Sequence, residues 1–232
     1  MPRPTRPLLS SISTKTVMAL TGLGLLGFVI AHMLGNLQVF AGREKLNAYA
    51  KTLQDLGPLL WVMRAGLFAL FVTHVACALR VTMWNKAARP QPYVSAKPQR
   101  STYAGRTMLM SGLIVTAFVV YHLLHLTFGV TNPDHHALLD AKGRPDVYGA
   151  VVAGFQQWPI SIAYVVAQVL LFFHLSHGAS SAFQTLGVTH PRLAFLKRGF
   201  GTAIAAVILL GNCAIPLSIA TGLIPCGGCG AR

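Results

Sequence analysis

The hydrophobic residues of this chain gather into five long runs, and most polar residues lie in the connectors between them. The runs cover residues 17–40, 58–84, 107–130, 159–183 and 199–222. Each is long enough to cross about 30 Å of hydrocarbon at about 1.5 Å per residue. Backbone groups cannot stay unpaired in lipid, so each run is predicted to be a helix. We expect an all-α integral membrane protein with five transmembrane helices, forming one domain over residues 1–232 without an internal repeat.

Composition agrees with a membrane protein and excludes several other classes. Hydrophobic residues make up 53% of the chain and charged residues 10%, whereas a soluble domain carries about a quarter charged residues. This excludes a disordered chain, a disulfide-rich miniprotein and an ordinary soluble enzyme. The net charge of +14 does not indicate nucleic acid binding, because the basic residues lie in short connectors, where they are typical of membrane orientation.

The distribution of Lys and Arg predicts the orientation. The N-terminal arm, the second connector and the fourth connector together carry twelve of them, and the first and third connectors with the C-terminal tail carry six. All five acidic residues lie on the side with fewer cations: Glu44, Asp55, Asp134, Asp140 and Asp146. The positive-inside rule therefore puts the N-terminus in the cytoplasm and the C-terminus outside. The basic cytoplasmic face suits a soluble partner with acidic patches.

Ionisable side chains inside the membrane are costly and indicate function. Six of the nine histidines fall within the runs: His32, His74, His122, His125, His174 and His177. Counted from the helix ends, His32 and His122 share one level, toward the outside. The count gives His74 and His174 another level, about five residues or roughly 8 Å further in.

Two pairs of imidazoles facing each other across a helical bundle suit two haem groups with two histidine ligands each. The first four helices would then form a haem-binding bundle. The alternative is that these histidines only hydrogen-bond neighbouring helices together. The chain has no C-x-x-C-H motif, so the haem would be the non-covalent b type. His125 and His177 each follow a proposed ligand by three residues. They are interpreted as hydrogen-bonding groups beside the ligands, with alternative ligation, propionate contact or a quinone pocket left open.

Two motifs carry less weight. Gly22, Gly24 and Gly27 satisfy the G-x-G-x-x-G pattern, but inside an apolar run rather than at a strand-to-helix turn, so close packing explains them. Cys226 and Cys229 form a C-x-x-C near the end of the chain, in the tail 223–232. A short disulfide or an inert tail is the simpler interpretation. The alternative is a Rieske-type [2Fe–2S] cluster that these cysteines and two outer histidines would bind in place of the outer haem.

Several segments resemble the cytochrome b558 membrane-anchor subunit of bacterial succinate dehydrogenase and fumarate reductase. They are MALTGLGLLGFVIAHMLGNLQVF, LNAYAKTL, VTHVACALRVTMWNKAARP, RTMLMSGLIVTAFVVYHLLHLTFG and LLFFHLSHGASSAFQTLGVTHPR. The resemblance covers about residues 16–217, and H-x-x-G-N, Y-H-L-L-H and H-L-S-H-G are its most specific parts. It implies a five-helix anchor in the bacterial inner membrane that docks a flavoprotein and an iron–sulfur subunit on the cytoplasmic side. The anchor would exchange electrons with a quinone, commonly menaquinone.

The resemblance also implies ligands. His74 and His174 would bind the inner haem b, and His32 and His122 the outer one, which is the pairing that the depth count gives. The Cys226 and Cys229 tail is not part of the family pattern. Dicarboxylate chemistry would belong to the soluble subunits, with no catalytic residue for it in this chain.

Some questions stay open at this stage. Glu44, Asp55 and His125 are candidates for a titratable group near a quinone. A homo-oligomer of the complex is an open possibility. The alternatives for function are the di-haem cytochrome of another respiratory dehydrogenase, or a transporter whose histidines relay protons.

Overall fold

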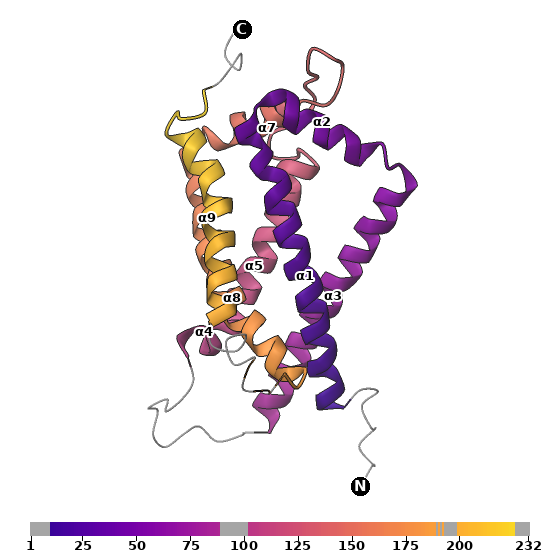
Figure 1. Cartoon of the computed structure of the whole chain (residues 1–232), viewed down its shortest axis with the longest axis vertical. Helices are drawn as coiled ribbons and strands as arrows, with labels where there is room; N and C mark the ends of the chain where they lie inside the picture. Colours follow the sequence, from indigo (N-terminus) through magenta and orange to yellow (C-terminus); the bar gives the residue numbers. More distant parts are fainter. Residues whose placement is uncertain (1–9, 89–101, 189, 191, 193–198, 226–232) are drawn as a thin grey trace.

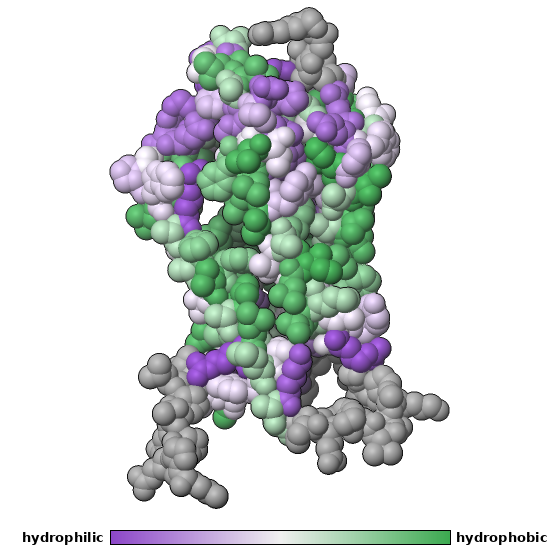
Figure 2. Space-filling view, turned by 180° about the vertical axis from the view of Figure 1, so that it is seen from behind, coloured by the Kyte–Doolittle hydropathy of each residue, from purple (hydrophilic) through white to green (hydrophobic). Residues whose placement is uncertain are grey.

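The computed structural model describes residues 10–88, 102–188, 190, 192 and 199–225. These residues contain helices and no strand, apart from one isolated bridge between Leu139 and Pro145. Five helical spans are long and apolar enough to cross a membrane, as expected of a multi-pass membrane protein. A broad apolar band separates two polar ends in the space-filling view (Figure 2).

Long helices form the membrane-spanning part (Figure 1). They are α1 (Ser11–Asn36), which continues as the 3₁₀ turn η1 (Leu37–Ala41), α3 (Pro58–Ala87), α5 (Met108–His122), which continues as the π-helical turn η2 (Leu123–Thr127), α8 (Trp158–Thr185) and α9 (Gly201–Ala220). The predicted runs match these spans. The largest difference is at α1, which begins six residues before position 17 because Ser10 caps its first turn by accepting a hydrogen bond from the amide of Ser13.

Short helices occupy the connectors. They are α2 (Arg43–Gln54), α4 (Tyr103–Arg106), α6 (Pro133–His136) and α7 (Val147–Phe155). Gly42 and Gly57 have φ values of 91° and 55°, which favour glycine, and they let the chain turn sharply before and after α2. Helices α2 and α7 contact each other and lie together at one end of the molecule (Figure 1), which we call the α2–α7 end. The opposite end, where α1 starts, is called the Ser11 end.

The packing of the long helices is uneven. Helix α8 packs against α9, α1 and α5, whereas α3 packs mainly against α1 and only weakly against α5. Toward the α2–α7 end α3 leans away from α1, so that α1, α2 and α3 form the sides of a triangle (Figure 1). The surface is correspondingly hollowed on the α3 side of the molecule (Figure 2). Among the described residues of α3, only Cys77 is buried.

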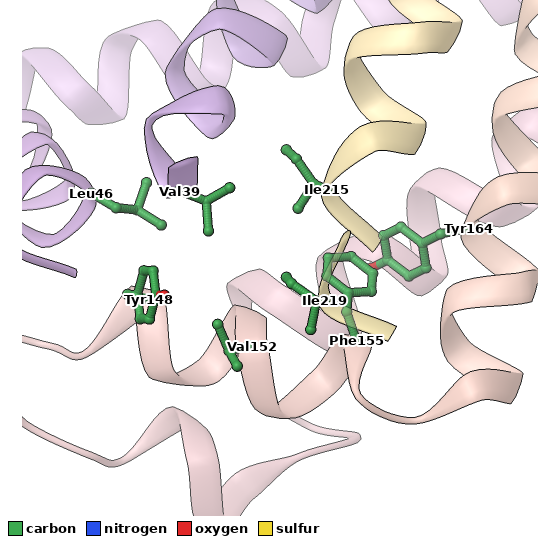
Figure 3. Close-up of a cluster of buried hydrophobic side chains, with 8 residues drawn as sticks. All are labelled: Val39, Leu46, Tyr148, Val152, Phe155, Tyr164, Ile215 and Ile219. Carbon is green, nitrogen blue, oxygen red and sulfur yellow. The ribbon is translucent and has the colours of Figure 1, made fainter. Parts of the chain in front are cut away.

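Two clusters of buried apolar side chains hold the rest together. One lies at the α2–α7 end and joins η1, α2, α7, α8 and α9 through Val39, Leu46, Tyr148, Val152, Phe155, Tyr164, Ile215 and Ile219 (Figure 3). The other lies lower in the bundle, between α1, α8 and α9, around Leu26, Met33, Ala179 and Ile208. Helix α9 therefore braces α1 and α8 from outside the four helices that carry the histidines.

Candidate functional site

Four intramembrane histidines meet in two pairs, and each helix of the four supplies one. His74 of α3 faces His174 of α8 with ring centroids 6.5 Å apart, which we call the α3–α8 pair. His32 of α1 faces His122 of α5 at 5.7 Å, the α1–α5 pair. These are the pairs that the sequence count predicts. The described contacts include no hydrogen bond between the two rings of either pair.

The α3–α8 pair is held by hydroxyl groups at the Nδ1 atoms. The Oγ1 atom of Thr21 lies 3.3 Å from Nδ1 of His74, which is also 3.1 Å from the carbonyl oxygen of Met18. In the same way, Oγ of Ser111 lies 3.4 Å from Nδ1 of His174. Because Nδ1 is occupied on both rings, each Nε2 stays available for a metal ion.

Glycine lets each of these rings lie close to the neighbouring helix. A Cβ atom on Gly22 would be 3.0 Å from Cε1 of His74, and one on Gly112 would be 3.3 Å from Cε1 of His174. Both distances are shorter than ordinary van der Waals contacts of a Cβ atom, which lie between 3.4 and 4 Å. The two glycines therefore form part of the seat for the imidazoles.

These contacts reveal an internal repeat that the sequence analysis did not find. Thr21-Gly22 on α1 and Ser111-Gly112 on α5 make the same contacts to the histidine of the next long helix. Each hydroxyl-glycine pair precedes, by ten residues from its glycine, a histidine of the α1–α5 pair. Helices α1 and α3 thus correspond to α5 and α8. Two matching residues are too short a pattern to identify a repeat in the sequence. The repeat is recognised only from the contacts that these residues make.

The repeat also sets the separation of the two pairs along the bundle. Gly22 contacts His74, and Gly112 contacts His174, so the α3–α8 pair lies at the level of the glycines. Ten helical residues up to His32 and His122 rise about 15 Å. The predicted separation of roughly 8 Å is therefore too small. The count began at helix ends that lie at different heights: α1 starts six residues earlier than predicted, and α8 has 28 residues against 20 in the α5 span.

The α1–α5 pair has aromatic surroundings. The ring of His32 stacks on Phe28 at 5.4 Å, and that of His122 lies 6.0 Å from the ring of Phe118. His122 has a hydrogen-bonding partner, because its Nδ1 lies 3.3 Å from the hydroxyl of Tyr164 on α8. His32 has no hydrogen bond to another described residue, and its side chain is exposed. An exposed imidazole at this depth is costly in lipid unless a further group covers it.

The two remaining intramembrane histidines are not opposite a second histidine. His125 is 2% exposed, its Nδ1 lies 2.8 Å from the Tyr164 hydroxyl, and its ring stacks on Tyr121 at 5.6 Å. Its Nε2 is buried without a hydrogen-bond partner. His177 lies against Gly105 of α4, where a Cβ atom would be 3.0 Å from its Cε1.

The spacing of the pairs fits two imidazoles on one metal atom. An imidazole nitrogen binds a transition metal at about 2 Å and lies about 1.2 Å from its ring centre, so opposed rings have centres about 6.4 Å apart. The observed 6.5 and 5.7 Å lie near this value. No group of three or more His, Cys, Asp or Glu side chains among the described residues could hold a metal ion. A metalloporphyrin would need no more than such a pair of side chains from the protein, because its ring supplies four nitrogens.

The carboxylates lie at the α2–α7 end and most of them are paired. Glu44 contacts Arg144 at 2.8 Å and Lys142 at 2.7 Å, and these cations lower the pKa of its carboxyl to about 2. Arg144 also contacts Asp140, holding the pKa of Asp140 well below its usual range. Asp55 pairs with Lys51. Of the candidates for a titratable group near a quinone, Glu44 and Asp55 are thus already bound to cations.

A buried polar core joins α2 to the segment before α7. Asn47 is fully buried and donates hydrogen bonds to Asp146 at 2.9 Å and to Asp140 at 3.2 Å. Its carbonyl accepts a hydrogen bond from the amide of Tyr148 at 2.9 Å. Asp146 also pairs with Arg43 at 2.6 Å and caps α7 by accepting from the amide of Gly149. This core fixes α7, which packs over Tyr164 and His125.

The cysteine interpretations have different outcomes. Cys226 and Cys229 lie outside the described residues, so the structure does not bear on a cluster or a disulfide there. Cys77 is buried in α3 and Cys213 is partly buried in α9, both as free thiols. These two behave as packing residues.

Comparisons with known proteins give no further guide: no family model, curated protein or solved structure matches this chain. The site is therefore interpreted from its geometry and from the sequence.

Proposed function

We propose that this chain is the membrane-anchor cytochrome b subunit of a succinate:quinone oxidoreductase, the respiratory complex II, in a bacterial inner membrane. It would pass electrons between an iron–sulfur subunit and membrane quinone, commonly menaquinone in the related family, through two b haems. The observation that carries this proposal is the pair of facing imidazoles at each of two levels, spaced as two ligands of one iron atom.

The residues of the chain fit two haem groups. His74 and His174 would hold one, and His32 and His122 the other. Haem iron carries a single electron by changing between its ferric and ferrous states. The chain's own part is to fix the ligands: Thr21, Ser111 and Tyr164 orient three of the four imidazoles through Nδ1. Such partners of a ligand's second nitrogen set both its orientation and its basicity.

The charge distribution supports the proposed orientation and partners. All five Asp and Glu residues of the chain lie at the α2–α7 end, whereas the charged residues that the structure describes at the Ser11 end are all Lys or Arg. With the Ser11 end in the cytoplasm, the positive-inside rule is obeyed. This basic face would dock the iron–sulfur and flavoprotein subunits through their acidic residues. The α3–α8 pair would then be the inner centre, nearer to the electron donor, and the α1–α5 pair the outer one.

A direct test measures haem in the purified complex. A dithionite-reduced minus oxidised spectrum with pyridine haemochrome quantitation should give two b haems per chain. His74→Ala and His174→Ala should each remove the inner haem and stop succinate:quinone activity, because only one of the two proposed imidazole ligands would remain. His177→Leu is the matched control, three residues from His174 on the same helix, and should keep two haems.

The same measurement separates the alternatives. Normal haem content in His74→Ala or His174→Ala would refute the ligand assignment. One haem per chain, with an EPR signal of a reduced [2Fe–2S] cluster, would favour a cluster at Cys226 and Cys229 with outer histidines. Two haems in a complex that contains molybdopterin or nickel instead of a covalent flavin would identify the cytochrome of another respiratory dehydrogenase.

A further inference from the structure

Tyr164 lies between His122, which belongs to the α1–α5 pair, and His125, which faces no second histidine. Its side chain is 6% exposed, and its ring packs edge-on against Phe155 at 4.7 Å and Phe118 at 5.0 Å. Figure 3 shows the Tyr164 ring beside Phe155 at the α8 side of the apolar cluster. The hydroxyl lies 3.3 Å from Nδ1 of His122 and 2.8 Å from Nδ1 of His125. The ring is therefore held by packing, and the hydroxyl by two imidazoles.

The protons of this group can be assigned once His122 binds iron. With Nε2 on the metal, Nδ1 of His122 carries a proton and donates it to the Tyr164 oxygen. The Tyr164 hydroxyl has one proton, so it must donate to Nδ1 of His125. His125 then carries its own proton on Nε2, the atom that is buried without a partner. The two hydrogen bonds of this group therefore run in one direction: His122 donates to Tyr164, and Tyr164 donates to His125.

The direction of these hydrogen bonds strengthens the effect of Tyr164 on His122. A hydroxyl that donates to His125 has a more negative oxygen, and so it is a better acceptor for the Nδ1 proton of His122. Partial withdrawal of that proton makes the imidazole a stronger electron donor to the metal. A stronger donor stabilises ferric iron and lowers the reduction potential.

The other three proposed ligands lack this arrangement. His74 and His174 contact aliphatic hydroxyls that themselves donate to backbone carbonyls: Thr21 to Val17 at 2.8 Å, and Ser111 to Met108 at 3.2 Å. His32 makes no hydrogen bond to another described residue. The residue of α3 that corresponds to Tyr164 in the repeat is Arg64, ten residues before His74 as Tyr164 is ten before His174. Its guanidinium lies 5.1 Å from the ring centre of Trp61.

We infer that Tyr164 is a positioning residue of the outer centre, which lowers the reduction potential of the iron bound by His32 and His122 through a hydrogen bond to His122 that His125 reinforces. The inference rests on the proposed function, since it needs a haem at this pair. Tyr164 would thereby lower the potential of one of two centres that are each proposed to have two histidine ligands.

The test is a redox titration of the two haems in the purified complex. Tyr164→Phe keeps the ring that packs on Phe155 and Phe118 and removes only the hydroxyl. The outer haem should become easier to reduce by about tenfold in its reduced-to-oxidised ratio, which is about 59 mV upward for one electron. The inner haem should keep its potential. The outer signal is assigned in the His74→Ala complex, which should hold only the outer haem.

Two further variants distinguish tuning from a structural effect. His125→Leu should shift the outer potential upward by less than Tyr164→Phe does, because the His122 hydrogen bond stays and only its reinforcement is lost. Ser111→Ala is the matched control, because it removes the hydroxyl beside His174 and should change the inner potential alone.

Each outcome has a clear meaning. Unchanged outer potential in Tyr164→Phe, with both haems present, would overturn the inference and leave the proposed function standing. If Tyr164→Phe loses the outer haem, His125→Leu decides, and an unshifted outer potential in that variant overturns the inference. A wild-type complex without haem would refute the proposed function, and the inference with it.

Discussion

Replacement of Asn47 by leucine should lower the stability of the α2–α7 end. Asn47 is fully buried on α2 and bonds at once to Asp146, to Asp140 and to the backbone amide of Tyr148. Leucine has the same branched arrangement of four side-chain heavy atoms and no hydrogen-bonding group. The change therefore keeps the branched shape and removes the polar contacts that attach α2 to the start of α7.

The cost follows from the two most buried partners. The Tyr148 amide would be left without its acceptor, which costs at least about 1 kcal/mol, and Asp146 would lose a charge-assisted hydrogen bond worth at least about 1.5 kcal/mol. The total of about 2.5 kcal/mol corresponds to a decrease of about 5 to 10 °C in the melting temperature of a chain this long. Asp146 keeps its contacts to Arg43 and Gly149, so α7 should still form.

The assay heats the purified protein in detergent and follows the reaction of a thiol-specific dye with Cys77, which is 7% exposed in the folded state. Lys51→Leu is the matched control, one turn later on α2, where the side chain is exposed and pairs with Asp55. An exposed pair contributes little, so this control should melt within about 2 °C of the wild type. Equal melting temperatures for Asn47→Leu and Lys51→Leu would refute the role given to the buried core.

Two further predictions concern the histidine seats and the surface carboxylates. Gly22→Ala should reduce the content of inner haem, because its Cβ would lie 3.0 Å from Cε1 of His74. The control is Gly24→Ala, whose Cβ would lie at an ordinary 3.4 Å from Leu70, and it should keep both haems. Equal haem content in the two variants would contradict the role given to Gly22. Glu44→Gln should lower the melting temperature at pH 7 but much less at pH 3. Because the folded-state pKa of Glu44 is about 2 against an ordinary 4.5, its pairs stabilise the fold above pH 4.5 and are lost as the pH falls toward 2. A melting difference that does not shrink between pH 7 and pH 3 would be inconsistent with that assignment.

The membrane-spanning helices could be predicted closely from hydrophobicity, because lipid forces every spanning segment to be helical. The predicted run 58–84 corresponds to α3 (Pro58–Ala87), and the predicted run 159–183 corresponds to α8 (Trp158–Thr185). The helices in the connectors were not predicted. Helix α2 is largely polar and buries only Leu46 and Asn47, and its sharp turns at Gly42 and Gly57 separate it from the apolar runs. Its position depends on contacts with α7, which lies a hundred residues further along the chain.

The candidate site was predictable in its histidines but not in their partners. Depth counted along four antiparallel helices is enough to pair His74 with His174 and His32 with His122, even when the helix ends are misplaced by several residues. The side chains that contact the Nδ1 atoms cannot be identified from the sequence. Thr21, Ser111 and Tyr164 belong to residue types that are common in membrane helices. Only the contacts distinguish them from other hydroxyls in the same spans.

Arg64 on α3 departs from the repeat, because its counterpart on α8 is Tyr164. Tyr164 can turn inward to His122 because a phenol is neutral and its ring packs against Phe155. A guanidinium in the same place would have to lose its hydration beside an imidazole, and a buried cation of this kind costs about 2.5 to 3.5 kcal/mol in a membrane helix. Arg64 lies only six residues after Pro58, about 9 Å along α3, so it can reach polar surroundings at the α2–α7 end. Helix α3 leans away from α1 toward the α2–α7 end (Figure 1). His32 of α1 is exposed, whereas His122 contacts the Tyr164 hydroxyl. The two histidines of the α1–α5 pair therefore differ in their surroundings: His122 has a hydrogen-bonding partner on α8, and His32 has an exposed side chain.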